Sequence, residues 1–433
     1  MHTPRAATHR PPRQILISMM DRLSLSNTLT YFLRFACASS AGILMLYAVE
    51  WMPRVTHGFA MYYTYSRTVL QGDPLAPLYD VDVFNMKMRS YGITNVVDMP
   101  NNPPTTALAT LPVAWLSPEN AKSVWTILLL LAFGASLALL FRTFGLSLRT
   151  NFGLGLFALT LVWRPLYENI AFGQMYVILL FGFSVSMWGL KRDVSFLTAT
   201  PVSTTLLLKG YGPLILLWFA ATKRWRELIS AAAIVLVVVA ITIPLLGASS
   251  WKVYFSEVVS SLGLLPVHAH VAYQTVNGLL FHLFTYDSRW LPFPILDLPT
   301  NAVRIISYTL NAAIVLATLA RARMASAPLT FAAMVAASVV TAPLAEEHHY
   351  VVFLPLVIGL SEMLHRRYSI TRRFGATETI FIISVLIIAI PLPFESLQFA
   401  AAPLVLLGYP KLYAGLALLF CFHRLTRPSS LVA

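Results

Sequence analysis

The sequence predicts an all-α protein that crosses a lipid bilayer several times, and its composition, tryptophans and apolar runs support this. Of 433 residues, 57% are hydrophobic and 11% are charged, with a mean hydropathy of +0.70. A soluble domain carries roughly 25% charged residues because its surface faces water, so this chain has too little polar surface to be soluble. Most of the nine tryptophans lie near the ends of apolar runs, as in an aromatic belt at a membrane interface; they are Trp51, Trp163, Trp188, Trp218, Trp225, Trp251 and Trp290.

The apolar runs have the length of membrane helices. Residues 123–141, 229–247 and 377–392 reach or approach the roughly 20 residues that cross a hydrocarbon core. In lipid the backbone must satisfy its own hydrogen bonds, and the alternating segments of a transmembrane barrel are missing from the sequence. We therefore predict a bundle of about 10–12 transmembrane or re-entrant helices with a long extracytoplasmic first loop.

The order of the elements follows from these runs. Residues 1–30 form a predicted cytoplasmic tail, and the apolar run of about 31–51 is a retained first helix, because it lacks a convincing cleavage site. Residues 31–424 form a single transmembrane domain, with extracytoplasmic loops at about 53–104 and 250–300. Residues 425–433 form a second cytoplasmic tail.

Basic residues in short loops set this orientation. The formal net charge is +13, and its excess lies beside apolar runs, as expected for cytoplasmic loops under the positive-inside rule. Membrane topology therefore explains the charge, and we expect no nucleic-acid partner. The two cysteines, Cys37 and Cys421, lie in apolar segments and predict neither disulfides nor a metal site. We expect no cofactor and no metal ligands, and leave open only whether a divalent cation assists.

Two apolar segments are too short or too interrupted to be simple spans. Residues 105–117 either cross the membrane or dip into it, and they end at Ser117, whose spacing from Glu119 and Asn120 suits a helix start. Residues 195–222 form two arms broken at 208–213, which predicts a hairpin from the cytoplasmic side. Interrupted membrane helices occur where they line a cavity, so both segments point to a site.

The run Glu346-Glu347-His348-His349 is the densest cluster of candidate groups. Two carboxylates and two imidazoles at a membrane boundary can exchange protons, bind a phosphate or hold a metal. The spacing is not that of a zinc protease. A polar interfacial cap without catalytic function is the alternative.

Lys209 and Asp98 are two further candidates. A charge at membrane depth is costly and usually functional, and Lys209 would suit a lipid-linked phosphate unless its side chain snorkels to the interface. Asp98 precedes a rigid Pro-rich turn and could serve as general base toward a sugar hydroxyl; a solvated loop acid is the alternative. No nucleotide-binding loop is present in the sequence, so we expect a lipid-linked sugar donor.

Several short motifs follow one another along the chain: residues 58–64, 72–74, 78–80, 102–108 and 172–174, Leu208-Lys209 with the basic loop 223–226, residues 273–275, and the cluster 346–349. From about residue 55 to 360, these motifs resemble those of glycosyltransferase family 87 and have the family's order. The family is similar to phosphatidylinositol-mannoside mannosyltransferases, which have the GT-C membrane fold. The resemblance implies inverting transfer of a hexose, typically mannose, from polyprenyl phosphate to a lipid or glycan acceptor, outside the cytoplasm at a bacterial plasma membrane.

The resemblance also implies roles for individual residues. Better-known members carry an aspartate base directly before the Phe-x-x-Tyr-Tyr run, where this chain has Gly58. We expect the base elsewhere, with Asp98 as first choice, Glu346 second and Glu50 third, or else activity is lost. Substrate binding is assigned to Lys209, His348, His349, Tyr62, Tyr63, Gln174, Arg164, Tyr273 and Gln274.

Two other readings of the sequence stay open. A lipid or sugar transporter, or a flippase, is also polytopic with interrupted helices, but it should show internal repeats and a polar path from both faces. The sequence shows neither. A catalytically inactive GT-C-like scaffold is the other reading, because Gly58 replaces the expected base.

Overall fold

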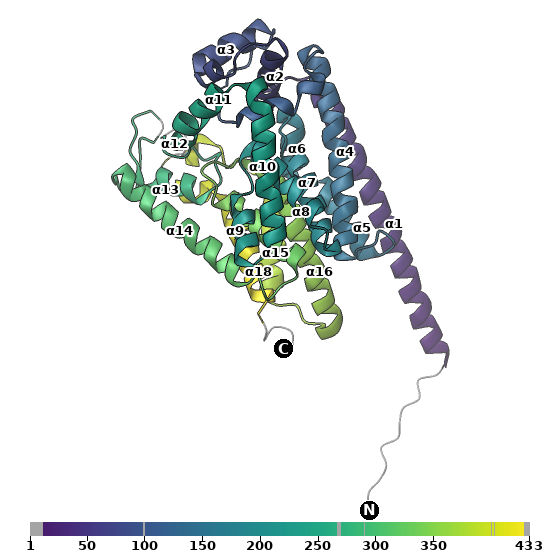
Figure 1. Ribbon diagram of the computed structural model, residues 1–433. Helices are drawn as coiled ribbons and strands as arrows, with labels where there is room; N and C mark the ends of the chain where they lie inside the picture. The colour runs from purple at the N-terminus through teal and green to yellow at the C-terminus, as the bar shows by residue number, and fades with distance from the viewer. Residues whose placement is uncertain are drawn as a thin grey trace, which may run out of the picture.

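The computed structural model describes residues 12–97, 100–265, 270–289, 291–399, 401 and 403–427. These residues form helices joined by loops, and among them the isolated bridge between Asp287 and Leu291 is the one β-type contact. Figure 1 shows the helices side by side, with short helices covering one end of the bundle. The predicted all-α class is confirmed.

Within the residues that the structure describes, four helices are long and apolar enough to cross a membrane. They are residues Asn27–Trp51 within α1 (Pro12–Trp51), α4 (Pro118–Phe144), α10 (Trp225–Leu246) and α14 (Thr300–Ala320). Two shorter apolar helices, α15 (Ala327–Val340) and α17 (Ala376–Ala389), accompany them. The chain is therefore a polytopic membrane protein, as predicted. The remaining bundle helices are α5 (Asn151–Leu161), α6 (Arg164–Phe172), α7 (Tyr176–Arg192), α8 (Ser195–Lys209), α9 (Pro213–Ala221), α13 (Val276–Phe284), α16 (Leu354–Thr371) and α18 (Pro410–Leu425).

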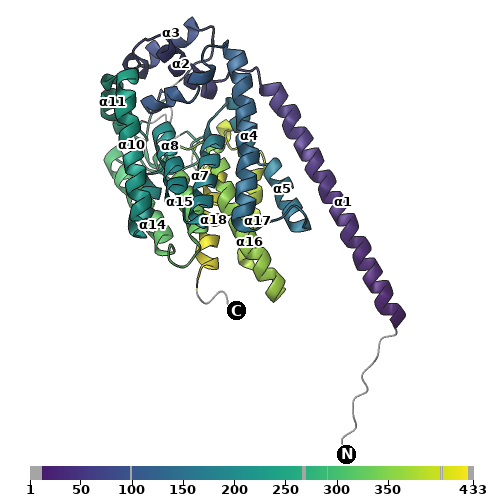
Figure 2. The same ribbon diagram turned by 45° about the vertical axis from the view of Figure 1, so that its right-hand side comes forward.

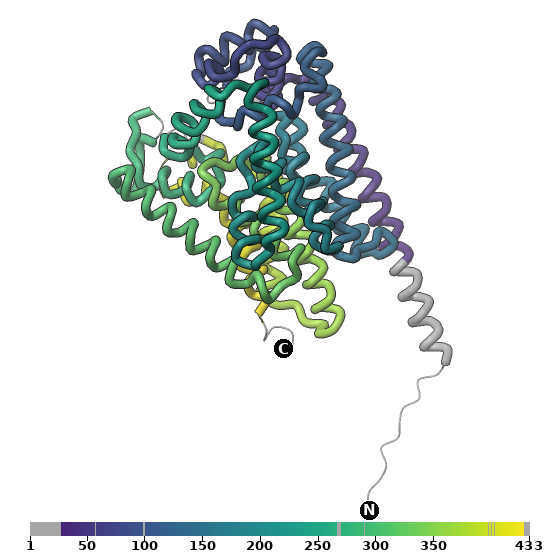
Figure 3. Tube along the Cα trace, in the orientation of Figure 1, coloured from purple at the N-terminus to yellow at the C-terminus, as the bar shows by residue number. Residues whose placement is uncertain are grey.

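Helix α1 begins earlier than the sequence predicts. The apolar run starts near Tyr31, yet the helix begins at Pro12, since the polar residues between them do not break it. α1 packs on α5 and α6 and stands at one side of the bundle (Figures 2 and 3). At the centre lies α15, whose residues are buried along nearly its whole length.

The first loop folds into a cap over one end of the bundle. The cap consists of α2 (His57–Leu70), η1 (Ala76–Tyr79), α3 (Val81–Ser90), η2 (Pro104–Leu108) and η3 (Leu111–Val113). Residues 105–117 thus turn within the cap, and η2 and η3 do not cross the bundle. Their prolines lack the backbone N–H that a longer helix needs. The predicted helix start is confirmed, because the Ser117 hydroxyl accepts a hydrogen bond from the Asn120 N–H of α4.

The cap rests on the break between α8 and α9. Gly210 (φ 67°) and Gly212 (φ 141°) end α8 in conformations that favour glycine, and Pro213 begins α9. The predicted break is confirmed. The hydroxyls of Thr105 and Thr106 donate to the carbonyl oxygens of Leu207 and Leu208, both at 2.6 Å. Those carbonyls have no partner inside a helix that ends here, so the cap is bonded directly to the end of α8.

Beyond α10, a short segment returns along the cap. It comprises α11 (Ala248–Val253), the π-helical turn η4 (Tyr254–Val258) and α12 (Val259–Ser261). Helix α11 contacts η1 of the cap. After α15 the chain forms a 3₁₀ helix, η6 (Glu347–Phe353), whose residues from His348 onward are buried, and this helix leads directly into α16. Two further 3₁₀ turns, η7 (Leu397–Phe399) and η8 (Leu404–Gly408), precede α18.

Candidate functional site

A cavity of about 450 Å³ lies between the cap and the bundle. Its walls come from α2, the α8–α9 break, the η4–α12 segment and the start of η6, so it forms where the two interrupted segments meet. Polar lining residues are Tyr62, Asn101, Asn102, Gln174, Tyr176, Lys209, Tyr211, Tyr254, Tyr273, Ser338, Thr341, Glu346, His348 and His349. Apolar lining residues include Met61, Val97, Leu214, Val259, Leu262 and Leu344.

Lys209 is the cation of this cavity. Its ammonium group donates a hydrogen bond of 2.9 Å to Asn102 Oδ1 and lies 4.9 and 5.3 Å from the ring centroids of Tyr62 and Tyr176. Lys209 ends α8, outside the four candidate spans. Burial lowers the pKa of the ammonium group to about 7, and the Glu346 carboxylate opposes this shift. An anion bound here would favour the charged form of the lysine.

The start of η6 supplies the carboxylate and both imidazoles. His348 Nδ1 lies 3.6 Å from Glu346 Oε2. The Glu346 backbone N–H donates to His349 Nδ1 at 3.0 Å, which leaves the His349 proton on Nε2. The pKa of His349 is held well below its usual value, first by burial and then by His348 and Lys209. His349 is therefore neutral, and its ring lies 3.9 Å from that of Tyr176.

Position 58 has no room for a side chain. A Cβ atom on Gly58 would lie 2.4 Å from the carbonyl oxygen of Phe172 and 2.9 Å from Gln174 Nε2. The Gln174 amide is itself held, since its Oε1 accepts a short hydrogen bond from the Tyr62 hydroxyl. The carboxylate that the resemblance implies at this position does not fit this backbone. Among the lining residues that the structure describes, Glu346 is the one carboxylate.

Asp98 lies outside the described residues. Val97, directly before Asp98, and Asn101, three residues after it, line the cavity. Asp98 therefore stays a predicted base. Glu50, the third choice, lies at the end of α1 about half exposed, where it pairs with Arg54 at 3.0 Å and does not line the cavity.

Of the nine residues to which substrate binding was assigned, six line the cavity and three do not. Lys209, His348, His349, Tyr62, Gln174 and Tyr273 are lining residues. The Tyr63 hydroxyl instead donates to the Leu116 carbonyl at 2.8 Å. The Gln274 side chain is buried, where it donates to the Gly408 carbonyl at 2.8 Å and accepts from the Lys411 backbone N–H at 3.1 Å. Arg164 pairs with Glu168 and with Glu347.

Sequence analysis missed Asn101, Asn102, Tyr176, Tyr211 and Tyr254, which also line the cavity. The tyrosines lie within or beside apolar runs, where an aromatic residue reads as core. Asn102 belongs to a motif of the resemblance, but nothing in its spacing indicates that it bonds Lys209.

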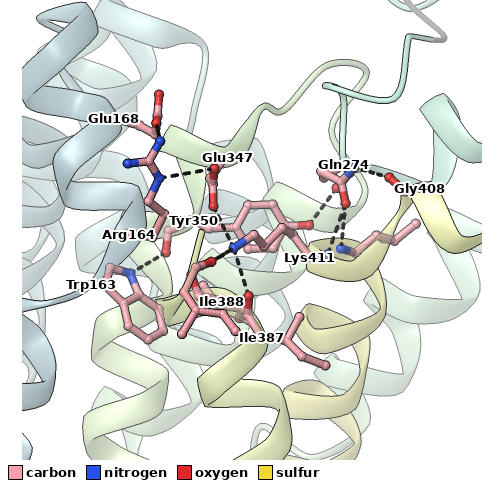
Figure 4. Close-up of polar contacts among 12 residues, drawn as sticks. Trp163, Arg164, Glu168, Gln274, Glu347, Tyr350, Ile387, Ile388, Gly408 and Lys411 are labelled. Atoms are coloured by element: carbon pink, nitrogen blue, oxygen red, sulfur yellow. Dashed lines mark hydrogen bonds and ion pairs between the residues drawn. The ribbon is translucent and has the colours of Figure 1, made fainter. Parts of the chain in front are cut away.

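A charged network connects η6 with α6 and α18 (Figure 4). Lys411, at the start of α18, has a fully buried side chain, and its ammonium nitrogen lies 2.6 Å from Glu347 Oε1. Arg164 Nε lies 3.8 Å from the other oxygen of Glu347. Burial raises the pKa of Glu347, and Lys411 and Arg164 oppose the increase. The sequence signal for Lys411 was a lysine directly after a proline at the start of an apolar segment.

Comparison with known proteins identifies one family. The model of glycosyltransferase family 87 matches residues 101–346, a stretch that includes Lys209 and ends at Glu346. No curated protein and no solved structure matches the chain. Among the described residues, no group of three or more histidine, cysteine, aspartate or glutamate side chains could hold a metal ion.

Proposed function

The chain belongs to glycosyltransferase family 87, and we propose that it transfers a hexose, with mannose the first choice, from a polyprenyl-phosphate donor to a lipid or glycan acceptor. The reaction would take place on the extracytoplasmic side of a bacterial plasma membrane. The observation that carries the proposal is that one cavity contains a half-buried lysine, a carboxylate and two imidazoles. A glycosyl phosphate needs a cation for its leaving phosphate and a base for the attacking hydroxyl.

The distribution of lining residues supports a lipid-linked substrate. The charged groups come from the end of α8 and the start of η6, and the amide groups come from the first loop and from the turn between α6 and α7. The start of α9, the segment 259–262 and the turn after α15 contribute Leu214, Val259, Leu262 and Leu344. A substrate with an anionic sugar head and an apolar chain would match both kinds of surface.

The proposed reaction inverts the anomeric carbon in a single displacement. The base takes the proton of the acceptor hydroxyl, whose oxygen then bonds to the anomeric carbon. The bond between that carbon and the phosphate oxygen breaks, and its electron pair leaves with the phosphate. Lys209 stabilises the charge that develops on that oxygen. Neutral His349, with its proton on Nε2, donates a hydrogen bond to the sugar or the phosphate.

Glu346 and Asp98 are the two proposed bases. Glu346 lines the cavity, and His348 beside it can orient its carboxylate. The chain that bears Asp98 passes the cavity at Val97 and Asn101. Gly58 leaves no room for a base at the position where better-known family members carry it.

The test uses purified full-length protein in lipid nanodiscs with radiolabelled mannosyl phosphoryl polyprenol and a lipid extract as acceptor. Label should move to a new lipid or glycan product, and Lys209→Met should suppress that transfer. GDP-mannose serves as the control donor. Transfer from GDP-mannose but not from the polyprenol would contradict the donor class, and movement of intact donor across the bilayer without any new glycosidic bond would favour a flippase.

A further inference from the structure

The 3₁₀ geometry of η6 gives its start two faces. With three residues per turn, residues three apart lie on the same edge. Glu346 and His349 therefore share an edge, and both line the cavity. Glu347 and Tyr350 share another edge, and both lie on the side of Lys411 and its charged network (Figure 4). One short helix thus carries the candidate catalytic groups on one side and a buried ion pair on the other.

Lys411 connects that second edge to the ends of two helices. Besides Glu347, its ammonium group donates to the carbonyl oxygens of Ile387, Ile388 and Ile390, at 2.8, 3.2 and 2.7 Å. These carbonyls lie at the end of α17, where a helix has no internal donors left. The lysine therefore holds Glu347 against the junction of α17 and α18.

Gln274 completes the support by bonding both ends of the same segment. Its backbone N–H donates to the Ala345 carbonyl at 2.8 Å, and its carbonyl accepts from the Tyr350 hydroxyl at 2.6 Å. Its side-chain oxygen accepts from the Lys411 backbone N–H at 3.1 Å. The cavity-facing residues of η6 thus depend on contacts made from behind, because the hydrogen bonds of a 3₁₀ helix are themselves weak.

We propose that Lys411 and Glu347 are positioning residues that hold Glu346, His348 and His349 in place at the cavity, without touching the substrate themselves. The catalytic part of this proposal rests on the proposed function, whereas the inference that the pair supports η6 does not. A shift of about 1 Å in a catalytic group can lower a rate about 100-fold. Loss of the pair should therefore lower kcat and leave KM for the donor nearly unchanged.

The variants are Glu347→Gln, which keeps the shape and removes the charge, Lys411→Met, and the double variant that carries both. A buried lone charge destabilises a protein, whereas a neutral replacement of both partners is often tolerated. The double variant should therefore regain thermal stability. The control is Glu227→Gln, because Glu227 is similarly buried (8% side-chain exposure against 12% for Glu347) and pairs with Arg224 at 3.3 Å, at the start of α10.

Hydrogen exchange in nanodiscs and transfer kinetics are measured on each variant. We expect backbone exchange over residues 344–354 to rise about tenfold or more in Glu347→Gln and in the double variant, with α16 beyond residue 358 unchanged. We expect kcat to fall about 10- to 100-fold in both, and the control to match the parent in both measurements.

Two results would overturn the proposal. Parent-like exchange over 344–354 in Glu347→Gln and in the double variant would mean that the pair does not hold η6. Full kcat in the double variant, with its stability regained, would mean that the pair contributes stability alone. If the parent protein transfers no sugar, the proposed function fails, and the exchange measurement by itself then decides whether the pair holds η6.

Discussion

Replacement of Lys209 by methionine is the most direct test of the proposed anion site. Methionine retains most of the apolar stem, so the packing between the Tyr62 and Tyr176 rings is kept while the charge is removed. A unit charge about 4 Å from a phosphate oxygen is worth about 4 kcal/mol at an effective dielectric constant of about 20. When Lys209 turns to the phosphate, it loses its 2.9 Å hydrogen bond to Asn102 Oδ1, and this loss offsets about 1 kcal/mol of the attraction.

The net loss is therefore about 3 kcal/mol, which corresponds to a fall in kcat/KM of about 100- to 200-fold. The assay is initial-rate transfer of labelled mannose from mannosyl phosphoryl polyprenol, with thermal unfolding of the same preparation to show that the variant is folded. Lys252→Met is the matched control, because Lys252 is exposed on α11 and does not line the cavity. A folded Lys209→Met enzyme with parent activity would refute the role of the lysine.

Three other experiments test the same site. Glu346→Gln and Asp98→Asn separate the two proposed bases. The variant that removes the true base should have a kcat about 100- to 10,000-fold lower than the parent. Equal, small decreases in both variants would contradict a general base at either position. The second experiment measures the binding of an uncleavable phosphodiester analogue, whose single charge does not titrate near neutrality. Its affinity should weaken roughly 20-fold from pH 6.5 to 8.5, because Lys209 has a pKa of about 7 and loses its charge across that range. In the same binding titration, Lys209→Met should abolish this pH dependence. Gly58→Ala should lower the free energy of unfolding by about 1–3 kcal/mol, because its Cβ would lie 2.4 Å from the Phe172 carbonyl oxygen. Gly134→Ala is the control and should leave stability unchanged, because a Cβ there has nothing within 4 Å. Equal melting temperatures of the two variants would contradict the crowding at position 58.

Much of the fold could be predicted because it depends on local patterns. The spans need only length and apolarity, the start of α4 needs Ser117, and the break after Lys209 needs the glycines and proline that follow. The boundary of α1 was predicted too late, since a helix can continue past its apolar run at little cost. Residues 105–117 had two open readings, because a proline-rich apolar piece can be stable in a membrane or inside a folded cap.

The candidate site could be predicted only in part. Lys209 and the Glu346–His349 run stand out because charged groups in apolar surroundings are costly. Their contacts do not follow from spacing. Arg164 and Gln274 were predicted to bind substrate, yet Arg164 pairs with Glu347 and Gln274 bonds the start of α18. The local sequence does not determine which distant groups the fold brings next to them.

The sequence by itself determined that this chain is a helical membrane protein with interrupted segments and a few deeply placed polar groups, since hydropathy and glycine or proline breaks act within a few residues. Only the tertiary structure decided that the cap bonds to the end of α8 and encloses a cavity there. It also decided that two neighbouring glutamates at the start of η6 face different ways, with Glu346 at the cavity and Glu347 against Lys411. These arrangements depend on contacts between residues more than 60 positions apart. A charged side chain can be buried only where such distant groups supply its partners.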